Sequence, residues 1–267
     1  MKYGNQVLRA HRNRYDAIDR FQTIGDRCSG TNYLQSLMRL NFPTLKHSEE
    51  LGWKHGFLDR RMADRNGLLV LVIYRHPIRW LQSFYNKQHE VSQTLGHLSF
   101  SEWIKAEWAP AWSIRSPDGT IKLEPIQADM IPHTTTPHRN ILAMRNSKIG
   151  WFEELAKLQC QVGYLRYEDL NRDPRGLISR IADAFELSPT TNFTPVSNYK
   201  GEAKRSYIPN QFPAVNMDDM NFIRDNIDID QENHIGYRLD DIPHWDGLSL
   251  HDSRVWRAML RRLITAK

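Results

Sequence analysis

Short runs of hydrophobic residues alternate along this chain with longer stretches in which hydrophobic positions recur every three or four residues. Residues 68–74 read Leu-Leu-Val-Leu-Val-Ile-Tyr, a continuous run of strand-forming residues. Such a run is typical of a strand that is buried on both faces in a parallel sheet. Residues 21–24 and 161–167 are two further predicted strands. The stretches with helical spacing predict helices at residues 31–40, 78–90, 99–108, 141–158, 175–186, 218–226 and 231–237.

Strands that alternate with helices predict an α/β fold with a central parallel β-sheet flanked by helices. The 267 residues contain no internal repeat and no low-complexity linker, so we expect one domain over residues 1–267. Residues 110–139 are rich in proline and contain an Asp118-Gly119 turn signal. Long irregular segments are often lids or binding loops, so we expect an insertion over the site here. Residues 242–267, rich in Trp and Arg, are expected to form a helical tail.

The composition is that of an ordinary globular protein, with 40% hydrophobic and 25% charged residues. A net charge of +5 suits an anionic ligand but is too small to predict nucleic-acid binding, which needs a clustered basic face. Two cysteines indicate a reducing compartment, so we expect a cytoplasmic protein. We expect neither a signal peptide nor a membrane span, because no hydrophobic run has the required length.

A loop bounded by Gly25 and Gly30 connects the first predicted strand to the first predicted helix. In a strand–loop–helix of this kind, backbone N–H groups and the positive end of the helix dipole meet at one point, where a phosphate can bind. The side chains of Ser29, Thr31 and Asn32 add hydrogen-bond donors at the same place. The loop therefore predicts an anion-binding site, although an ordinary strand–turn–helix without a ligand would have the same pattern.

The two glycines have the spacing of the nucleotide-binding P-loop, G-x-x-x-x-G-K-[ST]. The next two residues are Thr31 and Asn32, so both the lysine that contacts the β- and γ-phosphates and the hydroxyl that binds Mg²⁺ are missing. The loop is thus suited to holding a phosphate and poorly suited to metal-assisted phosphoryl transfer. A P-loop nucleotide or small-molecule kinase remains an alternative.

Further motifs follow the loop in a fixed order. They are Lys-His at residues 54–55, Arg75 at the end of the hydrophobic strand, Ser83 on the following helix, and Tyr-Glu-Asp-Leu at residues 167–170. With these motifs the sequence resembles the sulfotransferase superfamily over about residues 21–205. The resemblance implies a P-loop-like fold and transfer of a sulfuryl group from 3′-phosphoadenosine-5′-phosphosulfate (PAPS), with 3′,5′-diphosphoadenosine (PAP) as the product.

The resemblance implies that the first loop binds the 5′-phosphosulfate of PAPS. The residues that would do so are Arg27, Cys28, Ser29, Gly30, Thr31 and Asn32. Members of the family usually have Lys or Arg immediately before Ser-Gly-Thr, where this chain has Cys28. We therefore expect either Arg27 or Lys54 to supply the missing positive charge.

The resemblance assigns the 3′-phosphate to Arg75 and Ser83. Arginine suits this role because its planar guanidinium binds two phosphate oxygens at once. A third basic element of the family lies nearer the C-terminus. Its candidates here are Lys200, Gly201 and Arg205.

Sulfuryl transfer also needs a base, because the acceptor hydroxyl loses its proton as it attacks sulfur, and it needs cations for the charge on the leaving phosphate. Relatives place His or Glu between the first loop and the arginine strand, and histidine has a pKa suited to the task. We predict that His55 is the general base and that Lys54 stabilises the leaving group or the acceptor. In an extended segment the two side chains would point to opposite faces. The alternative bases are His47, Glu49 and Glu50.

The predicted function is therefore sulfuryl transfer from PAPS to an acceptor hydroxyl. Relatives that modify glycans and an abundance of tryptophan, which stacks on sugar rings, favour a carbohydrate acceptor; Trp53, Trp103, Trp108 and Trp112 are candidates. No metal is expected, since the reaction needs none and the chain has no H-E-x-x-H and no Cys-x-x-Cys motif. Besides the kinase, a non-catalytic nucleotide-binding protein of the same fold remains an alternative.

Overall fold

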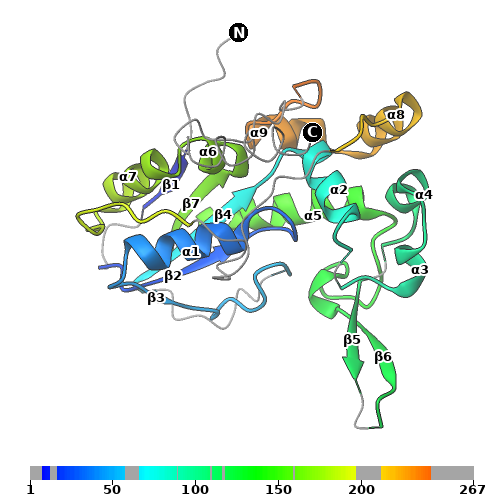
Figure 1. Cartoon of the computed structure of the whole chain (residues 1–267), viewed down its shortest axis with the longest axis horizontal. Coiled ribbons are helices and arrows are strands. Elements are labelled where there is room, and N and C mark those ends of the chain that lie inside the picture. Colours follow the sequence, from blue (N-terminus) through cyan, green and yellow to red (C-terminus); the bar gives the residue numbers. More distant parts are fainter. Residues whose placement is uncertain are drawn as a thin grey trace, which may run out of the picture.

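A five-stranded β-sheet forms the centre of the computed structural model, which describes residues 8–12, 17–57, 66–88, 90–108, 110–115, 118–158, 160–196 and 212–241. The strand order is β1-β7-β4-β2-β3 (Figure 1). The strands are β1 (Leu8–His11), β2 (Arg20–Ile24), β3 (Lys46–His47), β4 (Leu68–Tyr74) and β7 (Gln161–Arg166). Only β1, at one edge, is antiparallel to its neighbour. The expected α/β class with a mostly parallel sheet is thus confirmed.

The continuous hydrophobic run is the middle strand of the sheet. β4 pairs with β2 on one side and β7 on the other, and all seven of its residues are buried. Leu69, Leu71 and Ile73 face one helical layer, whereas Val70 and Val72 face the other. Since both faces are covered, no position of this strand favours a polar residue.

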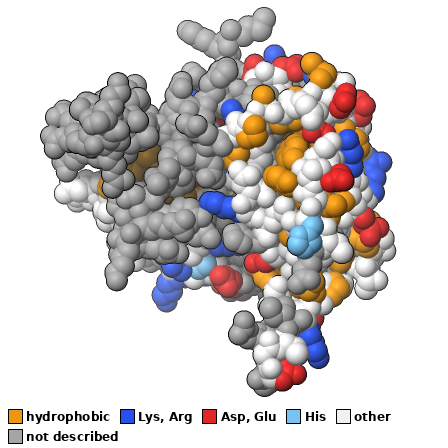
Figure 2. All heavy atoms as spheres, turned by 45° about the vertical axis from the view of Figure 1, so that its right-hand side comes forward, with side chains coloured by type: hydrophobic (Ala, Val, Ile, Leu, Met, Phe, Trp, Pro, Cys, Tyr) orange, Lys and Arg blue, Asp and Glu red, His pale blue; other side chains and the backbone are white. Residues whose placement is uncertain are grey.

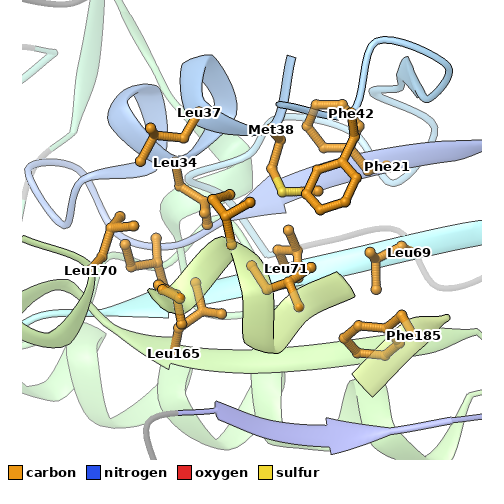
Figure 3. Packing of buried hydrophobic residues seen from close by; sticks show 14 of the residues in the cluster. Phe21, Leu34, Leu37, Met38, Phe42, Leu69, Leu71, Leu165, Leu170 and Phe185 are labelled. Carbon is orange, nitrogen blue, oxygen red and sulfur yellow. The ribbon is translucent and has the colours of Figure 1, made fainter. Parts of the chain in front are cut away.

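One face of the sheet is covered by the helices that follow β2 and β7. They are α1 (Thr31–Asn41), α6 (Tyr167–Arg172) and α7 (Pro174–Phe185). Leu34, Leu37 and Met38 of α1 point down toward Phe21 and Leu71 of the sheet (Figure 3). Complete burial of a side chain of this size contributes about 2 kcal/mol to the free energy of folding. This packing fixes the direction in which α1 leaves the glycine-bounded loop.

The other face is covered mainly by α5 (Ile141–Glu153), which ends earlier than the sequence suggested and continues as the 3₁₀ turn η2 (Glu154–Lys157). Ile149 and Phe152 of α5 belong to the hydrophobic cluster that includes Val70 and Val72. The same helix also buries two cations, Arg145 and Lys148. Both belong to the candidate site described below.

A third hydrophobic cluster lies beside the sheet, around Trp80, Phe84, Trp103 and Trp108. The helices that contribute to it or lie around it are α2 (Pro77–Tyr85), α3 (Gln93–Gly96), α4 (Phe100–Lys105) and α8 (Met217–Asn226). α9 (Ile229–His234) follows α8 and leads the chain back to the sheet. The helices predicted to reach residues 90 and 108 end at Tyr85 and Lys105.

The proline-rich segment is more regular than predicted. It forms a two-stranded hairpin, β5 (Ala111–Arg115) and β6 (Ile121–Pro125), followed by the 3₁₀ turn η1 (Gln127–Asp129). The prediction of an irregular segment was wrong because both stretches alternate in polarity, as strands do, and Pro125 is tolerated at the end of an edge strand. The hairpin projects away from the sheet (Figure 1).

Charged side chains of both signs are interspersed over the face of the described residues seen in Figure 2. None of the described helices is long and hydrophobic enough to cross a membrane. The predicted tail, residues 242–267, lies outside the described residues.

Candidate functional site

The glycine-bounded loop lies at the carboxyl end of β2 and starts α1. A Cβ atom on Gly25 would be 2.4 Å from the carbonyl oxygen of Ile73, and one on Gly30 would be 2.5 Å from the ring of Tyr167. Gly30 also has a φ of 102°, which favours glycine. Both glycines are therefore required for the loop to lie closely against the ends of β4 and β7.

The first turn of α1 has no side-chain cap, because its N-cap residue is Gly30. Uncapped N–H groups at this end of a helix, together with the helix dipole, are suited to an anion. The Ser29 hydroxyl is used within the loop, since it donates to the carbonyl oxygen of Asp26 at 2.6 Å. Thr31 is buried, and Asn32 accepts a hydrogen bond from Lys54 Nζ.

Arg75 lies against the loop, as the sequence predicts for two groups at the carboxyl ends of neighbouring parallel strands. Its Nη1 donates to the carbonyl oxygen of Cys28 at 2.9 Å, and its guanidinium lies 4.6 Å from the centre of the Tyr167 ring. The side chain is almost completely buried, and its Nε has no hydrogen-bond partner among the described residues. An unpaired N–H of a buried guanidinium is a donor suited to an anionic oxygen.

Ser83 of α2 completes this group of residues, because its side chain hydrogen-bonds with Cys28. Burial raises the pKa of the Cys28 thiol, although the charges of Arg75, Lys87 and Arg27 oppose the shift. The thiol is thus neutral near pH 7 and is not an activated nucleophile. The structure therefore brings the loop, Arg75 and Ser83 together.

Two buried side chains that the sequence analysis missed support this arrangement. Arg145 of α5 donates to the carbonyl oxygen of Arg75 at 2.9 Å and forms two hydrogen bonds with Glu232. Trp80 of α2 donates to the carbonyl oxygen of Arg27 at 2.9 Å. The available signal was the pair of cations, Arg145 and Lys148, within a helix that is otherwise largely hydrophobic.

Arg27 is directed into the protein. Its guanidinium donates to the carbonyl oxygen of Glu90 at 2.9 Å and forms an ion pair with the buried Asp129 of η1. It also lies 4.8 Å from the centre of the Phe84 ring and 5.2 Å from that of Trp108. Its charge is thus largely compensated within the protein. Of the two cations considered for the loop, the structure favours Lys54, which contacts the first turn of α1.

His55 is held by its backbone and by its ring. Its Nδ1 lies 2.7 Å from the carbonyl oxygen of Gly25, which can only accept, so Nδ1 carries the proton and Nε2 is left as the acceptor. Burial lowers the pKa of His55 to about 3, against the effect of the hydrogen bond to Gly25, and the charges of Lys54, Arg27 and Lys148 lower it further. At neutral pH the ring is neutral and Nε2 can accept a proton, but a pKa this low makes it a weaker base than the ordinary histidine that the sequence suggested.

Lys54 and His55 lie in a turn and not in a strand, so the expectation of opposite faces does not apply here. Both side chains contact the strand–loop–helix unit, Lys54 through Asn32 and His55 through Gly25. Two of the alternative bases have partners elsewhere: His47 packs edge-on against Phe21, and Glu50 accepts hydrogen bonds from Arg20 and Ser48.

The four candidate tryptophans fall into two groups. Trp103 and Trp108 are buried in the third hydrophobic cluster, where they cannot meet a ligand. Trp53 and Trp112 are only partly buried, and their ring centres are 5.1 Å apart. The ring centre of Trp53 also lies 5.4 Å from that of His55. This pair therefore adjoins the candidate base.

Three predicted ligands, Lys200, Gly201 and Arg205, lie outside the described residues. Within the described part of the chain, no group of three or more His, Cys, Asp or Glu side chains is arranged to hold a metal ion.

Comparisons of the chain with protein-family models, with curated proteins and with solved structures find no match. The resemblance to sulfotransferases therefore rests on the sequence motifs alone.

Proposed function

We propose that this protein is a sulfotransferase that transfers a sulfuryl group from PAPS to an acceptor hydroxyl. The observation that carries the proposal is the meeting of the glycine-bounded loop, Arg75 and Ser83, with the neutral imidazole of His55 beside the same loop. These groups offer anion-binding donors next to a base.

The two ends of the nucleotide would be bound by different groups. The uncapped first turn of α1 and Lys54 would hold the 5′-phosphosulfate. Arg75 and Ser83 would hold the 3′-phosphate, for which the unpaired Nε of Arg75 is a fitting donor. Lys200, Gly201 and Arg205 remain predicted ligands of the same nucleotide.

His55 would act on the acceptor. Its Nε2 takes the proton of the acceptor hydroxyl while the hydroxyl oxygen forms a bond to sulfur. The bond between sulfur and the phosphate oxygen breaks, and its electron pair leaves with PAP, whose new charge Lys54 faces. The negative charges of a bound nucleotide would raise the pKa of His55 and so strengthen it as a base.

The acceptor is proposed to be a carbohydrate. The partly buried ring of Trp53 lies beside those of His55 and Trp112, and indole rings stack well on sugar rings. A cytoplasmic location accords with two cysteines that are both free thiols.

One observation favours the non-catalytic alternative. Arg27, one of the two cations considered for the phosphosulfate, forms an ion pair with Asp129. A loop with too little positive charge could bind nucleotide without stabilising a leaving phosphate. Lys54 then decides between the two functions, since a catalytic site needs its charge.

Calorimetric titration tests the proposal. We expect PAP to bind more tightly than adenosine 5′-phosphate and than ATP with Mg²⁺, and Arg75→Ala to weaken PAP about 10-fold to 100-fold, because it removes charge-assisted hydrogen bonds. The same variant should bind adenosine 5′-phosphate with nearly unchanged affinity. Arg172→Ala, at an exposed arginine paired with Asp169, is the control. Tighter binding of ATP with Mg²⁺ than of PAP would favour the kinase. If Arg75→Ala weakened PAP and adenosine 5′-phosphate equally, Arg75 would not be a ligand of the 3′-phosphate.

A further inference from the structure

Lys148 joins three segments that are far apart in the sequence. Its side chain is completely buried, and Nζ donates to the carbonyl oxygen of His55 at 2.6 Å and to Oδ1 of Asp129. Nζ also lies 3.3 Å from Oδ1 of Asp26 in the glycine-bounded loop. One ammonium group therefore contacts the loop, the segment that carries the candidate base, and the turn η1 behind the hairpin.

We propose that Lys148 is a positioning residue, which holds the backbone of His55 so that the imidazole keeps its place beside the loop. The proposal rests on the function proposed above. It assigns Lys148 a role in turnover, because Nζ bonds to the base segment, whereas its contact with the loop is to the side chain of Asp26, which is not among the proposed nucleotide ligands.

Two backbone hydrogen bonds also tie the base segment, residues 53–57, to neighbouring segments. The N–H of Gly25 donates to the carbonyl oxygen of Lys54 at 3.0 Å, and the N–H of Phe57 donates to that of Ala128 at 2.6 Å. The segment is not part of a helix or strand, so these bonds and that of Lys148 replace regular secondary structure. Lys148 bonds to the carbonyl oxygen of His55 itself, so its loss would allow the backbone that carries the imidazole to shift.

The charges in this cluster are balanced. Arg27 and Lys148 face Asp26 and Asp129, and all four side chains are buried. Burial opposes the ionisation of Asp129, but the charges of Arg27 and Lys148 outweigh it and lower its pKa. Removing Lys148 alone leaves Asp26 without its ion-pair partner, whereas removing Lys148 together with Asp26 keeps the ion pair between Arg27 and Asp129.

Because the charges are balanced, a single and a double variant can distinguish a role of Lys148 in positioning His55 from a role in stability. Lys148→Met alone should destabilise the fold. The double variant Lys148→Met/Asp26→Asn removes one charge of each sign and leaves the ion pair between Arg27 and Asp129 in place, so we expect it to fold, while the bond to the His55 carbonyl is still missing. Lys157→Met is the matched control, because Lys157 is 72% exposed and pairs with Glu154 at the surface.

We expect the double variant to bind PAP within about threefold of the wild type and to lose about 100-fold in kcat, the effect of a reacting group misplaced by about 1 Å. The Nδ1 proton of His55, followed by NMR, should exchange faster with solvent because a displaced ring loses its hydrogen bond to the carbonyl oxygen of Gly25. A double variant with wild-type kcat would overturn the proposal, and so would an Nδ1 proton that exchanges as slowly as in the wild type. If the wild type neither binds PAP nor turns over, the proposed function fails. The exchange of the Nδ1 proton then still decides whether Lys148 positions the ring.

Discussion

The stability of this protein should depend on pH through His76, which follows Arg75 at the end of the central strand. Its side chain is 1% exposed, and Nε2 lies 3.0 Å from the carbonyl oxygen of Arg238, so Nε2 carries the proton of the neutral ring. Burial lowers the pKa of His76 from 6.5 to about 4, against the effect of that hydrogen bond, and the charges of Arg145, Arg79 and Arg75 lower it further.

The sign of the pH effect follows from the protonation of His76 in the folded and in the unfolded state. The folded protein keeps His76 neutral down to about pH 4, whereas the unfolded chain takes up a proton once the pH falls below 6.5. Stability contributed by the neutral ring is therefore present above pH 6.5 and is lost as the pH falls toward 4. The loss reaches about 1.4 kcal/mol per pH unit, which amounts to about 2 kcal/mol between pH 7.5 and pH 5.0.

Urea unfolding followed by tryptophan fluorescence at pH 7.5, 6.0 and 5.0 measures this loss. His76→Gln keeps a donor for the carbonyl oxygen of Arg238 but cannot titrate. We expect the variant to lose about 2 kcal/mol less than the wild type over this range. His97→Gln, at an exposed histidine, is the control and should behave as the wild type does. Equal losses in His76→Gln and the wild type would refute the argument that burial and the three arginines keep the ring neutral.

Three further predictions concern the site. Gly30→Ala should lower the free energy of unfolding by at least about 2 kcal/mol, measured by urea unfolding, because its Cβ would meet the Tyr167 ring at a φ of 102°. Gly52→Ala, at a φ of 88° but in open space, should cost only about 1 kcal/mol, and equal costs would contradict the steric argument. His55→Ala should reduce kcat by about 100-fold or more while PAP binding in calorimetry is kept, and an active variant would end its role as base. Trp112→Ala should raise the KM for a sugar acceptor several-fold with the Kd for PAP unchanged; an unchanged KM would remove the indole from the acceptor site.

The sequence predicts the parts of the site that are local in the chain. The central strand is recognisable because burial on both faces leaves residues 68–74 without a polar position, and the loop between Gly25 and Gly30 is recognisable because its spacing is local. Parallel strands then bring Arg75 to the same edge of the sheet as this loop.

The buried charges could not be predicted in the same way. Lys148 contacts Asp129 and the His55 carbonyl only after α5 has packed on the sheet. Asp129 also follows a hairpin that the sequence analysis did not predict, because the segment is rich in proline. A lysine within a helix is ordinarily a surface residue. Only the fold shows that this one is completely enclosed.

The loop and the arginine are coupled through a single residue. Cys28 has a φ of 63°, a conformation that few residues other than glycine adopt, and its carbonyl oxygen accepts the hydrogen bond of Arg75. A phosphate that binds the unpaired Nε of Arg75 leaves the bond from Nη1 to this carbonyl in place, and so keeps the loop in its present conformation. A ligand that fixes the loop would in turn hold the carbonyl toward Arg75. The two ends of one doubly phosphorylated nucleotide should therefore bind more tightly together than two separate phosphates would, because each end orders the contact that the other needs.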